Sequence, residues 1–170
     1  MKVHKGMRPH DIVVILKMAA LGKKEWMMKD LALELGISAS EVSESLNRSA
    51  FAGLISEDKK RIMKTALLEF LQYGLKYIYP QYPGAIVRGV ATAHSALPLS
   101  AQIESNEFIV WPFAEGKSRG QALEPLYPGA PAACLRDTKL YELLSLIDAL
   151  RIGKAREKTI AINEIKKRLS

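Results

Sequence analysis

The segment 31–46 constrains the fold of this chain more than any other. Apolar residues on one face predict a short helix over residues 29–35, and Gly36 follows where a helix end favours positive φ. Ser38 and Glu41 then stand at the spacing of a capping box, which predicts that a second helix begins here. Two helices joined by a tight glycine turn, the second of them strongly capped, indicate a helix-turn-helix.

The second helix is predicted over residues 39–51, with Val42 and Leu46 facing inward. Ala32 is small, so the two helices can cross closely, and Ile37 fills the turn between them. An ordinary antiparallel helical pair is the alternative interpretation. It does not require this combination of alanine, glycine, capping box and valine at these offsets, so the helix-turn-helix is favoured.

A short hairpin is predicted directly after these helices. Residues 53–56 and 61–63 have the apolar character of two strands, and the charged residues 57–60 join them. Such a hairpin beside a helix-turn-helix is a wing. The segment lacks the glycine or proline often found at wing tips, so a solvated basic loop is the alternative interpretation.

The rest of the chain predicts a mainly α fold with short β strands. The sequence divides into an N-terminal winged helix over residues 1–64 and a region 65–170, which has a mixed, proline- and glycine-rich middle and a C-terminal helical segment. Further helices are predicted over residues 8–21, 65–79, 138–152 and 155–169. Short strands are predicted over residues 26–28, 86–93, 108–111 and 120–123.

The charge of the chain favours an anionic partner. Lys and Arg together number 25 against 18 Asp and Glu, and the excess lies towards the two ends of the sequence. One cysteine, Cys134, excludes an internal disulfide, and with three scattered histidines it offers no four-ligand zinc site. The apolar stretch 12–21 is too short to span a membrane. We therefore expect a cytoplasmic protein without membrane, metal or cofactor.

The sequence offers no enzyme signature. His94 precedes Ser95, but adjacent residues cannot by themselves supply an oriented base and an oxyanion hole. Cys134 is flanked by alanines and leucine and is interpreted as a buried hydrophobe. The tripeptide within 116–120 lacks the earlier glycine that a phosphate-binding loop needs. We therefore predict no catalytic residue.

Two family resemblances follow from these motifs. Residues 8–63, with the helix-turn-helix pattern and the wing, resemble the reader module of bacterial winged-helix regulators, broadly the MarR-like group. The whole chain also resembles an uncharacterised group of bacterial proteins regarded as winged-helix DNA-binding regulators, some of them encoded beside nucleotidyltransferase-like toxin genes. That second resemblance implies an antitoxin-like role. It rests on residues 68–71, 88–93, 111–112, 119–128 and 140–151.

We therefore expect sequence-specific binding of double-stranded DNA by a transcriptional regulator. The second helix offers side chains to the major groove, and the wing and first helix offer lysine and arginine to phosphates. The candidate DNA-binding residues are Lys29, Ser38, Ser40, Ser43, Glu44, Asn47, Arg48, Lys59, Lys60 and Arg61.

The alternative function is a protein-interaction module, such as an antitoxin-like partner of a toxin, whose winged helix does not primarily read DNA. A homodimer is also expected. The apolar stripes of the two C-terminal helices, over residues 138–152 and 155–169, would join the two subunits.

Overall fold

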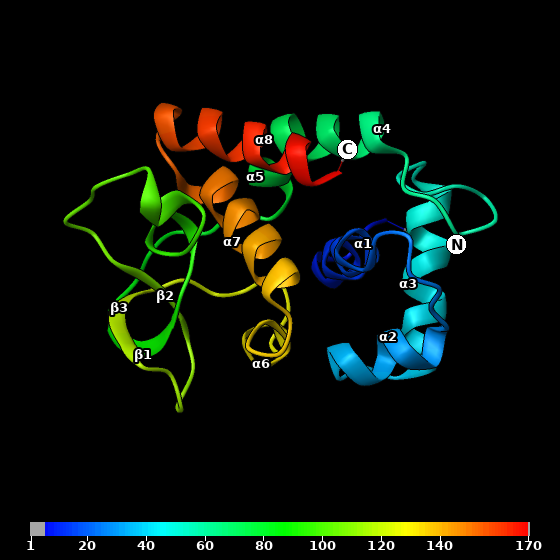
Figure 1. Cartoon of the computed structure of the whole chain (residues 1–170), viewed down its shortest axis with the longest axis horizontal. Coiled ribbons are helices and arrows are strands. Elements are labelled where there is room, and N and C mark those ends of the chain that lie inside the picture. The colour runs from blue at the N-terminus through cyan, green and yellow to red at the C-terminus, as the bar shows by residue number, and fades with distance from the viewer. Residues whose placement is uncertain (1–5, 170) are drawn as a thin grey trace, which may run out of the picture.

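The computed structural model describes residues 6–169 and is mainly helical with short strands, as the sequence predicts (Figure 1). The main helices are α1 (Pro9–Leu21), α2 (Met28–Leu35), α3 (Ala39–Phe51), α4 (Lys64–Glu69), α5 (Leu75–Ile78), α6 (Ala130–Cys134), α7 (Thr138–Ile152) and α8 (Ala155–Leu169). The strands are β1 (Ile86–Ala91), β2 (Ile109–Pro112) and β3 (Ser118–Ala122). A π-helical turn over Phe70–Gly74 joins α4 to α5, and 3-10 turns occupy Ala93–Ser95 and Leu99–Ala101.

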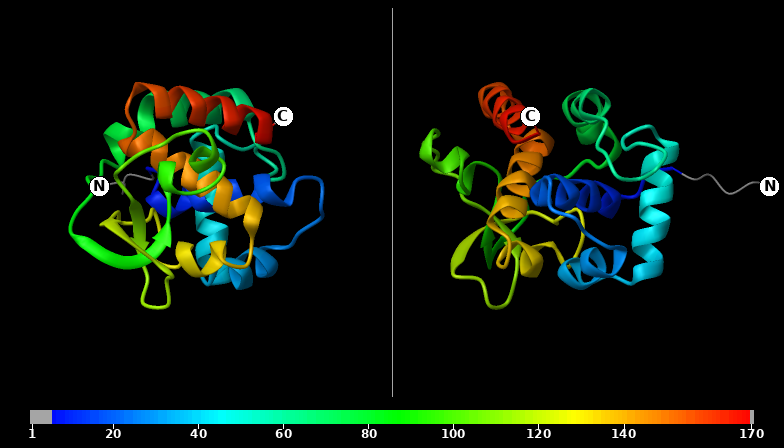
Figure 2. Two further views of the ribbon diagram at one scale, coloured as in Figure 1. Left: turned by 60° about the vertical axis from the view of Figure 1, so that its left-hand side comes forward. Right: turned by 45° about the vertical axis from the view of Figure 1, so that its right-hand side comes forward.

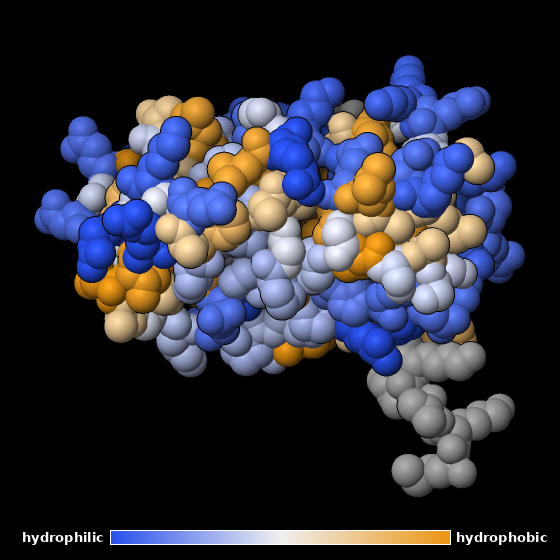
Figure 3. Space-filling model, turned by 90° about the horizontal axis from the view of Figure 1, so that it is seen from below, coloured by the Kyte–Doolittle hydropathy of each residue, from blue (hydrophilic) through white to orange (hydrophobic). Residues whose placement is uncertain are grey.

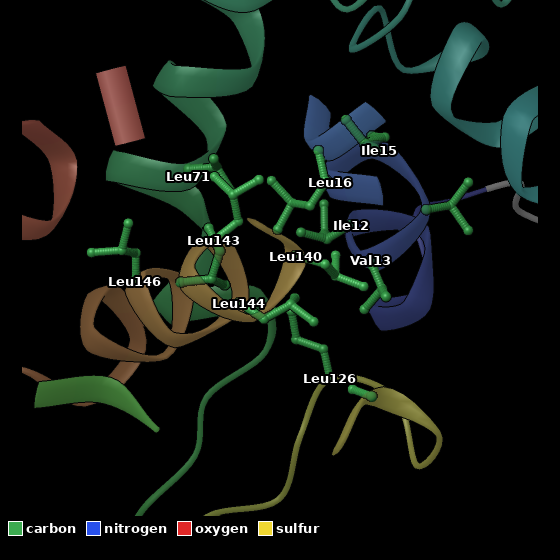
Figure 4. Packing of buried hydrophobic residues seen from close by; sticks show 14 of the residues in the cluster. Ile12, Val13, Ile15, Leu16, Leu71, Leu126, Leu140, Leu143, Leu144 and Leu146 are labelled. Carbon is green, nitrogen blue, oxygen red and sulfur yellow. The ribbon is translucent and has the colours of Figure 1, made fainter. Parts of the chain in front are cut away.

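The core lies around α1 and α7. Helix α1 carries five consecutive apolar residues, 12–16, and all five are fully buried, because α3 covers one side of the helix and α7 another. Figure 4 shows Ile12 and Leu16 of α1 pointing towards Leu140 and Leu143 of α7. One continuous cluster of buried side chains includes residues from both predicted regions, 1–64 and 65–170. The two regions therefore share a single core.

The helix-turn-helix has the local geometry that its sequence predicts. Gly36 adopts the left-handed conformation, with φ 69°, and ends α2. The Ser38 hydroxyl accepts the Glu41 backbone N–H at 3.1 Å and begins α3. Val42 and Leu46 are buried between the helices. The Glu41 side chain does not complete the predicted capping box, because its carboxylate contacts His10 and Arg48 instead.

The wing forms as a short hairpin. Ile55 and Ile62 pair as an antiparallel bridge, and the Ser56 N–H donates to the Arg61 carbonyl at 2.8 Å. Lys59 at the tip adopts a positive φ of 61°. The wing packs through Leu54 and Ile55, which are both buried, so the hairpin is fixed to the core although its paired region is short.

The strands form a small sheet at the end of the molecule opposite α3 (Figures 1 and 2). β1 pairs antiparallel with both β2 and β3, and β2 also pairs in parallel with β3, which closes the sheet into a barrel. Gly89 and Gly120 allow this closure, because an added Cβ would collide with backbone of the neighbouring strand region. The strand predicted over residues 26–28 is wrong, since α2 already begins at Met28.

The C-terminal helices are not available as the predicted dimer interface. In α7 every side chain from Leu143 to Arg151 is buried, and Ile162 and Ile165 of α8 are buried as well. A dimer through these helices would require their apolar stripes to be exposed in the single chain. The two helices instead cover each other, and α1 and the sheet region cover the rest of α7.

A buried polar cluster fixes α7 to the sheet. Both the Thr92 hydroxyl and the Trp111 indole N–H donate to Asp148 Oδ2, at 2.7 and 2.6 Å, and Arg151 donates to Asp148 Oδ1 at 2.9 Å. Burial raises the pKa of the Asp148 carboxyl, against the opposing effect of Arg151. All four residues are partnered within the core, so this cluster is structural.

None of the described helices is long and apolar enough to cross a membrane.

Candidate nucleic-acid interface

Helix α3 presents one exposed stripe of side chains. Ser40, Glu44 and Asn47 are exposed at spacings of four and three residues, which places them on one face. Ser43 lies at the edge of this face and is half-buried. Phe51 continues the same face one turn beyond Asn47, and its side chain is 80% exposed. Three polar side chains and one aromatic ring are therefore available to a partner.

Arg48 is a correction to the predicted reading face. Its guanidinium is buried, and it donates to both carboxylate oxygens of Asp11 at 2.8 and 2.9 Å. It also donates to Glu41 at 2.6 Å. Asp11 itself lies in the first turn of α1 and is fully buried. Arg48 therefore fastens α3 to α1 and cannot at the same time reach a guanine base.

The electrostatics around Arg48 match this anchoring role. Its hydrogen bonds with Asp11 raise the pKa of the guanidinium, although burial acts in the opposite direction. The hydrogen bond from Arg48 lowers the pKa of the Glu41 carboxyl, and His10 acts in the same direction. His10 Nε2 lies 2.6 Å from the Glu41 carboxylate.

The same cluster has the spacing of a metal site. Ligand atoms of His10, Asp11 and Glu41 lie within 4.8 Å of one another. Nη2 of Arg48 lies among them, at 3.3 Å from His10, 2.8 Å from Asp11 and 2.6 Å from Glu41. The guanidinium already pairs with both carboxylates, and Arg8 lies 3.7 Å from Glu41 as a second cation. The cluster is therefore assigned to the attachment of α3.

The three basic residues of the wing have different surroundings. The Lys59 ammonium donates to the Asn47 side-chain oxygen, which links the wing tip to the exposed face of α3. Lys60 and Arg61 are exposed and have no carboxylate partner among the residues that the structure describes. Asp58 accepts from Ser56 and from the Lys60 N–H, and these bonds shape the turn. Lys60 and Arg61 are thus the wing cations available to a phosphate.

The remaining candidates lie at the start of α3 and on α2. Ser38 caps α3 through its hydroxyl, which also lies 3.1 Å from the Ser40 hydroxyl. Its role in the structure is therefore local. Lys29 is exposed in the first turn of α2. The structure brings Asn47 and Lys59 together and places Ser40 on the same face of α3, whereas it removes Arg48 from this surface.

The C-terminal region supports the turn of the helix-turn-helix, which the sequence did not indicate. The Tyr127 hydroxyl is shared between the carbonyls of Leu35 and Gly36, at 2.6 and 3.0 Å. These carbonyls stand at the end of α2, where helix acceptors lack partners. Tyr127 is separated from them by more than 90 residues, so no local pattern could reveal the contact.

A buried lysine makes a second connection at this position. Lys17 of α1 contacts Glu34 of α2 and Asp137 at the start of α7, the latter at 2.6 Å. Burial opposes the charge on Lys17, but its hydrogen bonds with Asp137 and Glu34 outweigh burial and raise the pKa. The helix-turn-helix is therefore held to the rest of the chain on two sides, by Lys17 and by Tyr127.

The surface around α2 and α3 also carries exposed apolar side chains. Leu33 is 81% exposed, and Met27, Met28 and Phe51 are exposed too. Seen from the side of α2 and α6, hydrophobic residues form small groups separated by hydrophilic ones (Figure 3). This mixture is compatible with a polar ligand whose contacts include a few apolar side chains.

Comparisons of the chain with models of protein families, with curated proteins and with solved structures found no match.

Proposed function

We propose that this chain binds double-stranded DNA in a sequence-specific manner and acts as a cytoplasmic transcriptional regulator. The observation that carries the proposal is the arrangement of α3 and the wing. A capped helix presents polar side chains on one exposed face, and a hairpin with free cations stands beside it. Helix-turn-helix proteins place such a helix in the major groove.

The exposed face of α3 suits base recognition at one position above all. The Asn47 amide can pair with the edge of an adenine, and Ser40 can accept or donate to several bases. The Asn47 side-chain oxygen accepts from Lys59. An amide oxygen can accept twice, so Asn47 can still pair with both N6 and N7 of an adenine. Glu44 can accept a hydrogen bond from a cytosine amino group. Arg48 takes no part, because its contacts with Asp11 and Glu41 fix α3 in place.

The wing would contribute affinity without reading sequence. Lys60 and Arg61 are exposed and unpaired within the described chain, so both can neutralise phosphates next to the groove. Because the apolar stripes of α7 and α8 are buried within one chain, a homodimer on paired DNA half-sites would join through another surface.

The salt dependence of binding tests this role of the wing. Affinity for a pool of random duplexes should fall with salt with a logarithmic slope of roughly −0.9 for each phosphate neutralised. Lys60→Ala should weaken binding of all duplexes alike. It should also make the slope less negative by about 0.9, the value for one phosphate contact. Lys117→Ala, an exposed lysine between β2 and β3, is the matched control. An unchanged slope in Lys60→Ala would contradict this role.

A second candidate function is the binding of a partner protein, as in an antitoxin. Phe51 favours it, because this exposed aromatic ring continues the face of α3 that carries Asn47. Glu44 on the same face would be repelled by DNA phosphates but not by a basic partner. In this case a partner that co-purifies with the chain should be lost from Phe51→Ser and retained by Leu97→Ser, a variant at another exposed apolar residue. Retention by both variants would contradict it.

A further inference from the structure

A groove lies on the side of the wing that faces α1 and α8. It has a volume of about 370 Å³. The end of α1 and the loop after it form one wall, the second half of the wing and the start of α4 form another, and the end of α8 closes it. Figure 2, left, shows these three parts of the chain on the same side of the molecule. We call it the wing groove; its lining residues are Met18, Ala19, Gly22, Lys23, Trp26, Lys60, Arg61, Ile62, Lys64, Arg168 and Leu169.

The charge of the wing groove is of one sign. Five of its lining residues are cations, and no carboxylate belongs to the lining among the residues described. Arg168 is already satisfied, because it pairs with Glu142 at 2.9 Å and with Glu164 at 2.6 Å. The other four are Lys23, Lys60, Arg61 and Lys64, and each is exposed without an ion-pair partner in the described chain. Asp58, whose carboxylate interacts with Lys60 and Arg61, balances these four charges only in part. The remaining excess around one hollow favours a ligand that carries more than one negative charge.

The remaining lining is apolar and includes a flat ring. Trp26 is half-buried and packs against the core, and Ile62 and Leu169 lie beside the same hollow. A tryptophan face can stack against a planar ring, and lysine and arginine are the usual partners of phosphate. The volume is that of small-molecule sites, which begin near 300 Å³. A DNA duplex is far wider than such a hollow and could only lie across its rim.

We propose that the wing groove binds a free nucleotide, a phosphate ester that carries a planar base. Lys60, Arg61 and Lys64 would contact the phosphates from the wing side, and Lys23 would contact them from the loop after α1. The base would lie against Trp26. The proposal concerns binding by the protein alone and does not depend on DNA binding.

One consequence does rest on the proposed DNA-binding function. Lys60 and Arg61 line the groove and are also the free cations of the wing. A nucleotide that neutralises them would weaken the hold of the wing on DNA, and DNA would weaken nucleotide binding by the same factor. The groove would then act as the effector site of the regulator.

Titration of the full chain with ADP, in the absence of DNA, tests the proposal. Calorimetry measures the affinity, and tryptophan fluorescence gives its location, because Trp26 borders the groove whereas Trp111 is buried in the core. We expect saturable binding with a fluorescence change that disappears in Trp26→Phe. Lys64→Glu should weaken binding by roughly tenfold or more, corresponding to about 1.4 kcal/mol. Lys117→Glu, the same charge reversal at an exposed site outside the groove, should leave the affinity within a factor of about two.

Three further titrations separate the parts of the ligand. Adenosine should bind much more weakly than ADP, because it lacks the phosphates, and pyrophosphate should bind more weakly because it lacks the ring. Absence of saturable binding of ADP at millimolar concentration would overturn the proposal. Equal affinity for adenosine or for pyrophosphate would also overturn it, as would an unchanged affinity in a folded Lys64→Glu variant. A single-stranded oligonucleotide that displaces ADP and binds more tightly would assign the groove to nucleic acid instead.

Discussion

Replacement of Arg48 by alanine should destabilise the fold strongly, and this follows from the surroundings of Asp11. The Asp11 carboxylate is fully buried, and both of its oxygens accept from the Arg48 guanidinium, at 2.8 and 2.9 Å. Removing one partner of a buried pair leaves the other charge uncompensated, at a cost of about 3–5 kcal/mol. Asp11 keeps one further hydrogen bond, from the Arg8 N–H at 2.7 Å. We therefore expect a loss near the lower end, about 3 kcal/mol.

Urea denaturation followed by circular dichroism measures this loss as the change in the free energy of unfolding. Arg88→Ala, at an exposed position of β1, is the control and should change stability by less than about 0.5 kcal/mol. The paired replacement Asp11→Leu with Arg48→Met should recover most of the loss, because no buried charge then remains. A loss below about 1 kcal/mol in Arg48→Ala, together with a changed DNA sequence preference, would refute the structural assignment of Arg48.

Three further predictions concern other ionisable groups. The pKa of Glu41 is lower in the folded state, so its carboxylate stabilises the fold fully at pH values above its ordinary pKa. This stabilisation is lost as the pH falls through the folded-state pKa. In a plot of the unfolding free energy against pH, Glu41→Gln should therefore have a flatter slope on the acid side. Lys17→Met should cost about 1–3 kcal/mol in urea denaturation, because Asp137 loses its charged partner, and an unchanged midpoint would contradict this. Burial raises the pKa of the Cys134 thiol, so iodoacetamide should modify it only in unfolded protein, as mass spectrometry at increasing urea would show.

Local patterns predict the local structure of this chain well. The turn at Gly36 and the cap at Ser38 depend on residues close in the sequence, and both have the expected geometry. The same holds for the long apolar helices and for most of the short strands. The start of α2 was misplaced, because Trp26 and Met28 resemble a strand by composition alone, whereas Asp30 accepts the Met27 N–H and begins the helix.

The role of Arg48 shows where the sequence argument was incomplete. A polar residue on a capped helix was assigned to the exposed face by its chemistry, although its position places it beside Ser45 and Ser49, which are both buried. The missing partner was Asp11, a carboxylate next to five consecutive buried apolar residues. An acidic residue beside such a run is a signal for a buried ion pair. The cation that pairs with this carboxylate is set by the way α1 and α3 cross, which the sequence does not show.

The expected position of the dimer interface was wrong for a related reason. The apolar stripe of α7 was expected to lie on the surface, where a second subunit would cover it. Residues 143–151 are buried on every side, so α7 is a central helix of the fold. The contacts of Tyr127 with α2 and of Asp148 with Thr92 and Trp111 span 37 residues or more. Contacts of this kind come from the tertiary fold and leave no periodic pattern in the sequence.

Selection of duplexes from a random pool tests the central claim most directly. The full chain should enrich a defined sequence that contains an adenine in a fixed position. Asn47→Ala should then lose the preference at that position, at a cost of about 1–3 kcal/mol in discrimination, and keep its affinity for the rest of the site. Asn163→Ala, an exposed asparagine on α8, should select the same sequence as the unmodified chain. Enrichment of no sequence by the folded chain, or an unaltered preference in Asn47→Ala, would contradict the proposal that α3 reads DNA.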